Sequence, residues 1–284
     1  MISDAFRAFK HRRRLARARA EIAARPDAPG RAHGLPAPLV VSLTSYPGRF
    51  ATLGLTLQAI LRQSVRPDRV ILWLDDGHEA LLPADMRALA GLEVLTCPNW
   101  RSYKKIVPTL LAHPEAFVVT ADDDVYYPAD WLERLVAAAG QGARVACHRA
   151  HRITLRDGLP APYAQWRRNV DAPESSPLTF LTGVSGVIYA PRVLHPDVTR
   201  SDLFLRLAPR SDDVWLYWMH RLNGVQAQKI GGRIRILEWE GSQAQSLRTD
   251  NLQGTGNDRA VAAMIAHYGW PGADRAPRSA PSAR

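Results

Sequence analysis

Residues 117–124 read Phe-Val-Val-Thr-Ala-Asp-Asp-Asp, an apolar run that ends in three adjacent acids. The first four residues have the length and composition of a buried strand. Asp122, Asp123 and Asp124 follow where that strand ends. Adjacent carboxylates repel one another, and holding three at a buried strand end costs on the order of several kcal/mol without a compensating cation. Oxygen ligands with open positions for phosphate suit Mg²⁺ or Mn²⁺.

A purely structural explanation of the same acids is an acidic loop or a helix cap. An Asp near a helix start stabilises the helix by about 0.5–2 kcal/mol, and one of the three acids could have that role before the helix expected over 129–139. Three acids in a row, directly after an apolar strand, favour the cation site.

On both sides of this strand, short apolar runs alternate with helical patterns. Buried strands are expected over 39–43, 69–74, 92–95, 117–120 and 145–147, and helices over 53–63, 104–111, 129–139 and 214–219. This alternation predicts a mostly parallel sheet with helices on both faces. Right-handed crossovers then place the carboxyl ends of the strands along one edge, where ligands bind in open α/β sheets.

A second acidic pair, Asp212-Asp213, precedes an apolar helical stretch that ends near Asn223-Gly224. Acids are favoured at a helix start, so capping explains the pair. A carboxylate in this place also suits a general base for an acceptor hydroxyl, which needs hydrogen-bond reach and a suitable pKa. Both interpretations remain open from the residues alone.

The charge of the 284-residue chain is uneven. Its net charge is +10, and residues 1–35 hold nine Lys and Arg against three acids. We expect a basic helical arm with its linker over 1–38, a folded domain over 39–270 and a disordered tail over 271–284. The helix over 1–24 suits an anionic membrane surface, nucleic acid or plain solvent.

The remaining composition narrows the class of protein. Two cysteines, Cys97 and Cys147, do not make a disulfide framework, and no Cys/His spacing suggests zinc. Apolar runs long enough for a transmembrane helix or a signal peptide are missing from the sequence. We therefore expect reduced thiols in a cytoplasmic protein.

Six short blocks, in this order, resemble bacterial glycosyltransferases of the GT-A fold, close to the family 2-like enzymes that build capsular and lipopolysaccharide glycans. The blocks are residues 41–49 (VSLTSYPGR), 101–105 (RSYKK), 119–125 (VTADDDV), 147–151 (CHRAH), 182–187 (TGVSGV) and 212–216 (DDVWL). The resemblance implies a GT-A-like, Rossmann-related three-layer α/β/α sandwich with a mostly parallel central sheet. It also implies a nucleotide-sugar donor, in particular a UDP-sugar, and a glycan or lipid-linked glycan acceptor.

By the same resemblance, roles carry over position by position. The donor nucleotide and its diphosphate would meet Thr44, Tyr46, Arg49, Arg101, Lys104, Asp122 and Asp123, with Lys105 as a nearby candidate. The metal, Mn²⁺ or Mg²⁺, would be held by Asp124 and Asp122. The sugar and the acceptor would meet His148, His151, Trp166, Thr182, Gly183, Ser185 and Gly186. The catalytic base would be Asp213, with Asp212 as the alternative, because the family usually carries Glu-Asp where this chain has Asp-Asp.

The implied reaction is a single displacement with inversion at the anomeric carbon, in which the metal neutralises the leaving diphosphate and the base takes the acceptor proton. Tyr163 and Trp166 lie in a polar loop and are candidates for stacking on the acceptor. Trp215 and Trp218, three residues apart on an apolar helix, are expected in the core. Ser246 and Asn257-Asp258 are candidates for a loop that closes over the donor.

Two other classes of protein compete with this interpretation. A magnesium phosphatase with an aspartyl nucleophile would also carry an Asp-x-Asp motif, although usually after its first strand. A nucleic-acid-binding protein would use the basic arm, but the acidic clusters repel phosphates and no nucleic-acid motif is recognised, so no nucleic acid is expected. For a transferase, the arm suggests peripheral attachment to the inner face of the cell membrane.

Overall fold

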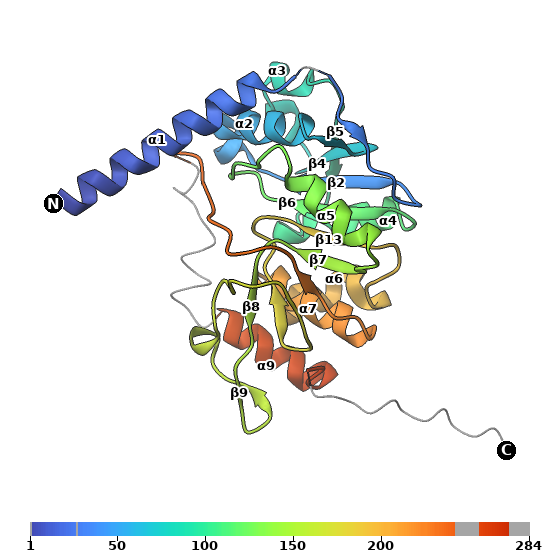
Figure 1. Ribbon diagram of the computed structural model, residues 1–284. Helices are drawn as coiled ribbons and strands as arrows, with labels where there is room; N and C mark the ends of the chain where they lie inside the picture. Colours follow the sequence, from blue (N-terminus) through green and yellow to red (C-terminus); the bar gives the residue numbers. More distant parts are fainter. Residues whose placement is uncertain (1, 27, 242–255, 273–284) are drawn as a thin grey trace.

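The computed structural model describes residues 2–26, 28–241 and 256–272, and it is built around one large sheet (Figure 1). The eight strands of that sheet follow the order β11-β14-β7-β13-β6-β2-β4-β5. Their bounds are β11 (Glu174–Ser175), β14 (Gln228–Lys229), β7 (Val145–Cys147), β13 (Val187–Tyr189), β6 (Phe117–Ala121), β2 (Leu39–Thr44), β4 (Arg69–Asp75) and β5 (Leu92–Cys97). All five strands expected from the sequence are among them.

One half of the sheet is parallel and the other half is mixed. Strands β6, β2, β4 and β5 are parallel neighbours, with Val41 paired to Val70 on one side and Val119 on the other. Strand β13 runs antiparallel between β6 and β7, with Ile188 opposite Val119 and Ala146. The expected mostly parallel sheet is therefore present, and β13 is an antiparallel insertion that the sequence pattern did not predict.

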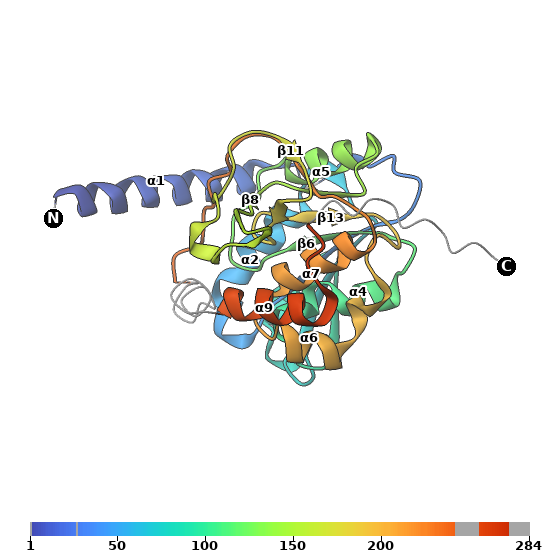
Figure 2. The same ribbon diagram turned by 90° about the horizontal axis from the view of Figure 1, so that it is seen from below.

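Helices cover both faces of the sheet (Figures 1 and 2). They are α1 (Ile2–Ala24), α2 (Phe50–Leu61), α3 (Ala84–Arg87), α4 (Val107–Ala112), α5 (Trp131–Gly140), α6 (Ser201–Leu207), α7 (Asp212–Leu222) and α9 (Gly256–Tyr268). Successive strand residues point to opposite faces, and Ile188 packs in the core with α2 and α5 while Val187 and Tyr189 pack in the core with α7 and α9. The result is a three-layer α/β/α arrangement.

Shorter elements connect these layers. They are β1 (Arg31–Ala32), β3 (Val65–Arg66), β8 (Ala150–Arg152), β9 (Leu155–Arg156), β10 (Leu159–Pro160), β12 (Thr179–Leu181) and the 3-10 helices η1 (Pro47–Arg49), η2 (Glu79–Leu81), η3 (Arg101–Lys105), η4 (Tyr163–Gln165) and η5 (Pro196–Thr199). The single helix expected over 104–111 is wrong in detail, because η3 and α4 are separate and meet at Ile106. Pro108 is tolerated only in the first turn of a helix, so one helix cannot run through it.

Helix α1 is docked by its second half only. Leu15, Ala18 and Ile22 are buried, whereas Phe6 is 55% exposed and Phe9 is 50% exposed. Figure 1 shows the first half of α1 standing away from the body of the molecule. Just beyond the helix, the Arg25 guanidinium donates to the carbonyls of Ala59 and Tyr127, both at 2.7 Å. The arm is thus an element of the folded structure at its carboxyl end.

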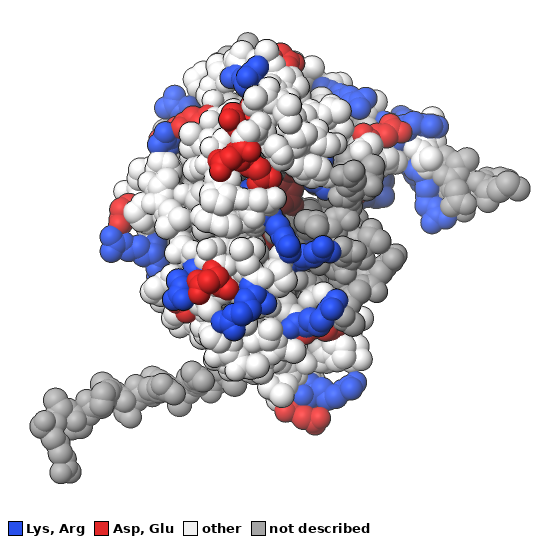
Figure 3. All heavy atoms as spheres, turned by 180° about the vertical axis from the view of Figure 1, so that it is seen from behind, with Lys and Arg blue, Asp and Glu red and all other residues white. Residues whose placement is uncertain are grey.

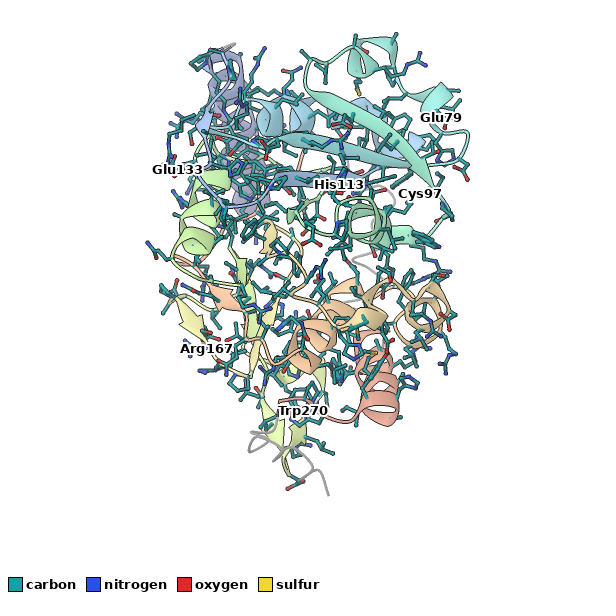
Figure 4. All side chains as sticks on the ribbon, turned by 90° about the vertical axis from the view of Figure 1, so that its right-hand side faces the viewer. Glu79, Cys97, His113, Glu133, Arg167 and Trp270 are labelled. Atoms are coloured by element: carbon teal, nitrogen blue, oxygen red, sulfur yellow. The ribbon has the colours of Figure 1, made fainter. Side chains whose placement is uncertain are left out.

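Figure 4 shows the edge strand β5 in the upper part of the view and α9 in the lower part. Cys97 marks the end of the edge strand β5, and Trp270 lies beyond α9 at the far end. Both cysteines are free and buried. Across residues 2–26, 28–241 and 256–272, no helix is long and apolar enough to cross a membrane.

Candidate active site

A pocket of about 430 Å³ opens at the carboxyl ends of β2, β4 and β6, the edge at which the sequence places the acids. Its wall comes from the loops that follow these strands and β5. The lining residues are Thr44, Ser45, Tyr46, Arg49, Asp75, Asn99, Arg101, Ser102, Lys104, Lys105, Ala121, Asp122 and Asp123. This volume is in the range of small-molecule sites.

The acidic triplet is tied to the loop after β2. Asp123 is 4% exposed and accepts from Ser45 Oγ at 2.6 Å and from Arg49 Nη1 at 2.5 Å. The same Arg49 nitrogen lies 3.0 Å from Asp124 Oδ2. Arg49 is therefore placed between two of the three acids, and Asp123 is anchored inside the protein.

The electrostatics of the triplet show an excess of negative charge. Burial, the charge of Asp122 and the charge of Asp123 raise the pKa of Asp124 to about 7, although Arg49 opposes the change. Burial also raises the pKa of Asp123. The pKa of Arg49 is raised as well, because the attraction of Asp123 and Asp124 outweighs its burial. The positive charge of the Arg49 guanidinium does not fully neutralise the negative charge of these carboxylates.

Lys105 joins the triplet to the second acidic pair. Its Nζ lies 3.1 Å from Asp122 Oδ1 and 3.1 Å from Asp212 Oδ2, and the residue is 7% exposed. Burial lowers the pKa of this ammonium, but Asp122, Asp212 and Asp213 together raise it well above its usual value. Lys105 is charged, and it brings carboxylates from residues 90 positions apart into one cluster.

Asp213 binds a neighbouring loop through its carboxylate. Its Oδ1 accepts from the backbone N–H of Gly183 at 2.8 Å. The hydroxyl of Ser211, at the N-cap of α7, donates to Asn257 Oδ1 at 2.8 Å. Burial and the nearby Asp212 raise the pKa of Asp213 to about 7, against the effect of Lys105. A carboxylate with a pKa near neutrality can accept and release a proton at working pH.

The Thr182–Gly186 loop passes directly beside this carboxylate. Ser185 and Gly186 have φ of 81° and 93°, and the Ser185 carbonyl accepts from Trp131 Nε1 at 2.7 Å. A Cβ on Gly186 would lie 2.6 Å from the Trp131 ring, and one on Gly183 would lie 3.0 Å from both Asp213 Oδ1 and Lys105 Nζ. Thr182 is 2% exposed. Small residues are required here by close packing.

The residues expected to meet the nucleotide line the same pocket. Lys104 Nζ pairs with Asp75 Oδ1 at 2.5 Å, and Thr44 donates to the Trp73 carbonyl at 2.8 Å. Arg101 has φ of 56° and its guanidinium donates to the Pro209 carbonyl at 3.1 Å. Tyr46 lies with its ring 5.5 Å from the Arg49 guanidinium carbon.

Three polar lining residues were missed by the sequence reasoning. They are Asp75, Asn99 and Ser102. Asp75 carried a usable signal, because it ends the second buried strand at the same edge as the acidic triplet. Asn99 lies in a loop and Ser102 lies in η3, and the sequence around them carries no periodic pattern.

None of the seven residues predicted to meet sugar or acceptor is in the described lining of this pocket, and three of them are buried elsewhere. His148, His151 and Trp166 are each 3% exposed and are absent from its described lining. His148 Nε2 bonds to the Trp131 carbonyl at 3.0 Å, and His151 Nδ1 accepts from the Asn169 N–H at 3.0 Å. Burial lowers the pKa of both histidines to about 4, so they are neutral.

The other aromatic residues considered for the acceptor or the core in the sequence analysis are also buried. Trp215 and Trp218 are fully buried, which confirms that they belong to the core. Tyr163 is 8% exposed and packs on Trp166, with ring centroids 4.8 Å apart. These two rings are packed into the core cluster and present little surface to an acceptor.

The candidates for a closing loop are only partly described. Asn257 and Asp258 lie in the first turn of α9, where Asp258 Oδ1 accepts from the Tyr163 N–H at 2.7 Å. They are therefore helix residues bonded to the body, and the expectation that they form a loop is wrong. Ser246 lies outside the described residues.

A divalent cation fits the chemistry of this site if two carboxylates and the substrate phosphates hold it together. Within the described ranges, no group of three or more His, Cys, Asp or Glu side chains converges to hold a metal. Asp122 and Asp124 supply hard oxygen donors, and the raised pKa of Asp124 shows that added positive charge would be favourable. Mg²⁺ is commonly held by one or two carboxylates together with substrate phosphates, and these residues fit that type of site.

Comparison with solved structures decides the fold. GalNAc-T7, solved with UDP, GalNAc and Mn²⁺, matches with a TM-score of 0.50 and 11% identity, over 80% of this chain and 47% of that chain. The fold is GT-A. The GT-A fold explains why the acids gather at the carboxyl ends of β2, β4 and β6, since ligands of open α/β sheets bind along that edge.

Two further structures are less similar in shape. TarS residues 1–349 from S. aureus match with a TM-score of 0.45 and 16% identity, over 70% of this chain and 59% of that chain. The 4-diphosphocytidyl-2C-methyl-D-erythritol synthase from Anaerococcus prevotii matches with a TM-score of 0.44 and 11% identity, over 72% and 95%. The chain thus spans about three fifths of the TarS 1–349 chain and about half of the GalNAc-T7 chain. No family model and no curated protein sequence matches it.

Proposed function

We propose that this chain is a glycosyltransferase that moves a sugar from a nucleotide-sugar donor, such as a UDP-sugar, to a hydroxyl of a glycan or lipid-linked glycan. The observation that carries this proposal is the Lys105 bridge. It brings Asp122, at the end of β6, and Asp212, at the start of α7, to the same ammonium at 3.1 Å each. The proposed donor site and the proposed proton-accepting site would therefore be adjacent on the GT-A fold.

The donor would lie in the 430 Å³ pocket. Arg49, Arg101 and Lys104 line it and supply positive charge for a diphosphate, with Lys105 at the inner end. Tyr46 and Thr44 offer the base and ribose a ring face and a hydroxyl. Guanidinium and ammonium groups stabilise charge that develops on a leaving phosphate, and fixed positions make that stabilisation effective.

The acceptor proton would go to Asp213. Its carboxylate is held by the Gly183 N–H at 2.8 Å, at the loop that would lie beneath the donor sugar. As the acceptor oxygen forms its bond to the anomeric carbon, the bond from that carbon to the donor phosphate breaks and the hydroxyl proton moves to Asp213. Such a single displacement inverts the anomeric configuration. Asp212, which is paired with Lys105, is the alternative base.

Asp124 and Asp122 would hold Mn²⁺ or Mg²⁺ together with the donor phosphates. The bound cation supplies charge neutralisation at the diphosphate. Mn²⁺ is present with UDP in GalNAc-T7, which has the same fold. The remaining roles in the site belong to the residues already described.

We further propose that the arm places the enzyme at the cytoplasmic face of a membrane, near a lipid-linked acceptor. The support is chemical: α1 carries exposed Phe6 and Phe9 among basic residues, the composition of an interfacial helix. The folded domain over 39–270 and the tail over 271–284 complete the proposed organisation, and no nucleic acid is needed in it.

A thermal-shift panel tests the proposal. Nucleoside diphosphates and nucleotide sugars are added with and without Mn²⁺ to wild type and to Asp124→Ala. A ligand at one hundred times its dissociation constant stabilises the folded state by about 2.7 kcal/mol. We expect one nucleotide to give a Mn²⁺-dependent shift that Asp124→Ala loses.

The matched control is Asp202→Ala, because Asp202 is an exposed acid on α6 whose ion pair is with the exposed Arg200. This variant should keep the full shift. Absence of any nucleotide shift in wild type would contradict the transferase proposal. Covalent phosphate on Asp122 after incubation with a phosphate ester would support the phosphatase instead.

A further inference from the structure

A second and larger cavity, of about 620 Å³, lies away from the donor pocket along one side of α1. One wall is α1 itself, and the other is the segment 234–237. Its floor is the stretch 125–131, which continues from the acidic triplet. We call this cavity the arm groove. Its volume is in the range of small-molecule sites.

The helix wall of the arm groove is basic for a geometric reason. Arg7, Lys10, Arg14 and Arg17 line it, and their spacing of three or four residues puts them on one face of α1. Arg12 and Arg13 are exposed on the same helix but are absent from the described lining. In Figure 3 the Lys and Arg side chains gather along the projecting arm. The α1 cations that line the groove are therefore those of one face of the helix.

The acids that line the arm groove do not cancel this charge. Glu21 pairs with Arg25 at 2.8 Å, and Asp130 pairs with Arg134. Arg235 adds a further cation on the opposite wall. The lining thus has a clear net positive charge, and a groove with this charge attracts anions.

The deeper lining is apolar. Val125 and Trp131 are each 3% exposed, and Ile234, Ile236 and Leu237 are half-buried along the far wall. A groove that offered only cations would suit a free anion, and one that offered only these side chains would suit a hydrocarbon. Both surfaces line one cavity, so one molecule can contact both.

We propose that the arm groove binds a single amphiphile that carries a phosphate group on a hydrocarbon chain. The phosphate contacts the basic face of α1 and Arg235, and the chain lies against Trp131, Ile236 and Leu237. The cations and the apolar side chains face each other across a cavity. A lipid that contacts both walls must therefore leave the bilayer and enter the protein. A flat membrane surface would instead contact the projecting tip of α1, where Phe6 and Phe9 are exposed.

The position of the arm groove links it to the donor site. Trp131 and Ser185 both line it, and Trp131 Nε1 donates to the Ser185 carbonyl at 2.7 Å. Ser185 belongs to the loop whose Gly183 N–H holds Asp213. An amphiphile in the groove is therefore separated from the proposed base by one loop. Binding in the groove does not itself depend on the proposed transfer reaction.

The test compares two charge reversals on one helix. Lys10→Glu with Arg14→Glu removes cations that line the groove, and Arg12→Glu with Arg13→Glu makes the same change of charge on residues outside it. Dodecyl phosphate, kept below its critical micelle concentration, is titrated by calorimetry into the full chain. We expect the first pair to weaken binding at least tenfold and the second pair to weaken it less than twofold.

Other probes decide between the possible occupants. Inorganic phosphate and dodecyl maltoside should each bind far more weakly than dodecyl phosphate, and equal binding of either one would overturn the proposal. Equal losses in the two variant pairs would also overturn it, because that result indicates general attraction to a basic helix. A dimer in wild type that only the first pair disrupts, measured by light scattering, would make a second copy of the chain the occupant.

Vesicles of phosphatidylcholine with phosphatidylglycerol test the bilayer itself. If the tip of α1 contacts a flat surface, both variant pairs should reduce vesicle binding equally. Equal loss of vesicle binding in both pairs, together with unchanged dodecyl phosphate binding in both, would reject the groove in favour of a surface contact. Both pairs should keep the nucleotide thermal shift of wild type, so failure of the groove and failure of the transferase proposal are separate results.

Discussion

At the scale of single residues, Lys105 and Asp213 are central to the electrostatics of the candidate site. The Lys105 ammonium touches Asp122 and Asp212 and lowers the pKa of Asp213, while burial and Asp212 raise that pKa. These opposed effects leave Asp213 with a pKa of about 7. A base with this pKa is half ionised at neutral pH and can be protonated during a reaction.

Asp213→Asn should lower the rate of sugar transfer by about 10²–10⁴-fold, the usual contribution of a general base. The side chain keeps its shape and an oxygen that can accept from the Gly183 N–H, so nucleotide binding should stay near normal. Transfer to a hydroxyl acceptor and the nucleotide thermal shift are measured on the same preparation. Near-normal turnover would leave Asp213 as a residue that only holds the Gly183 loop.

The same carboxyl predicts a pH dependence of stability. Its pKa is about 7 in the folded protein and about 3.9 in an unfolded chain, so the folded state binds more protons between these values. The contribution of Asp213 is therefore full below pH about 4 and is lost as pH rises through about 7.

Urea unfolding of wild type and Asp213→Asn at several pH values checks this, since the difference cancels other titrating groups. The free energy of unfolding of wild type should fall relative to the variant as pH rises. A constant difference would show that Asp213 has an ordinary pKa.

Much of the site could be predicted at this scale, because acids at strand and helix ends are visible in sequence. Asp122, Asp124 and Asp213 lie where the pattern placed them. The ion pair between Lys104 and Asp75 could not be predicted, since it joins η3 to the end of β4, 29 residues away in the sequence. His148 and Trp166 were misjudged because a polar or aromatic residue in a loop carries no signal for its burial.

At the scale of elements, the Thr182–Gly186 loop contains two closely packed glycines, and Gly186 is the one with a positive φ. Gly186→Ala would combine a φ of 93° with a Cβ 2.6 Å from Trp131. Gly142 has a similar φ of 96° with nothing within 4 Å of a Cβ, so Gly142→Ala is a matched control for strain alone.

We expect Gly142→Ala to cost about 1–2 kcal/mol and Gly186→Ala to cost about 1–3 kcal/mol more, through overpacking. Urea unfolding measures both. Equal losses would mean that the ring of Trp131 moves aside without cost. Loss of transfer activity in Gly186→Ala alone would further tie the loop to the site.

Strands were predictable where they are long and apolar, as β2, β4 and β6 are. Strand β13 has three residues, Val187–Tyr189, and a run this short does not by itself separate strand from loop; β7 is equally short and was expected all the same. Its antiparallel place between β6 and β7 is set by packing of both faces. The break at Ile106 was foreseeable, because Pro108 follows within two residues.

At the scale of the whole molecule, α1 is joined to the body by a short apolar contact. Ile22 is 1% exposed and Phe9 is 50% exposed on the same helix. Ile22→Ala should therefore lower the free energy of unfolding by about 2–5 kcal/mol. Phe9→Ala should change it by less than about 0.5 kcal/mol, as exposed substitutions do. Thermal unfolding compares the two, and equal effects would show that the whole of α1 packs in solution.

The burial of Cys97 and Cys147 makes this protein suitable for site-directed labelling. Burial raises the pKa of Cys97 to about 11 and that of Cys147 to about 12. The thiolate of an accessible cysteine attacks a maleimide, so both native thiols should react slowly at neutral pH. An Arg12→Cys variant would then carry a fluorophore or spin label on the outer face of α1, with no native cysteine removed.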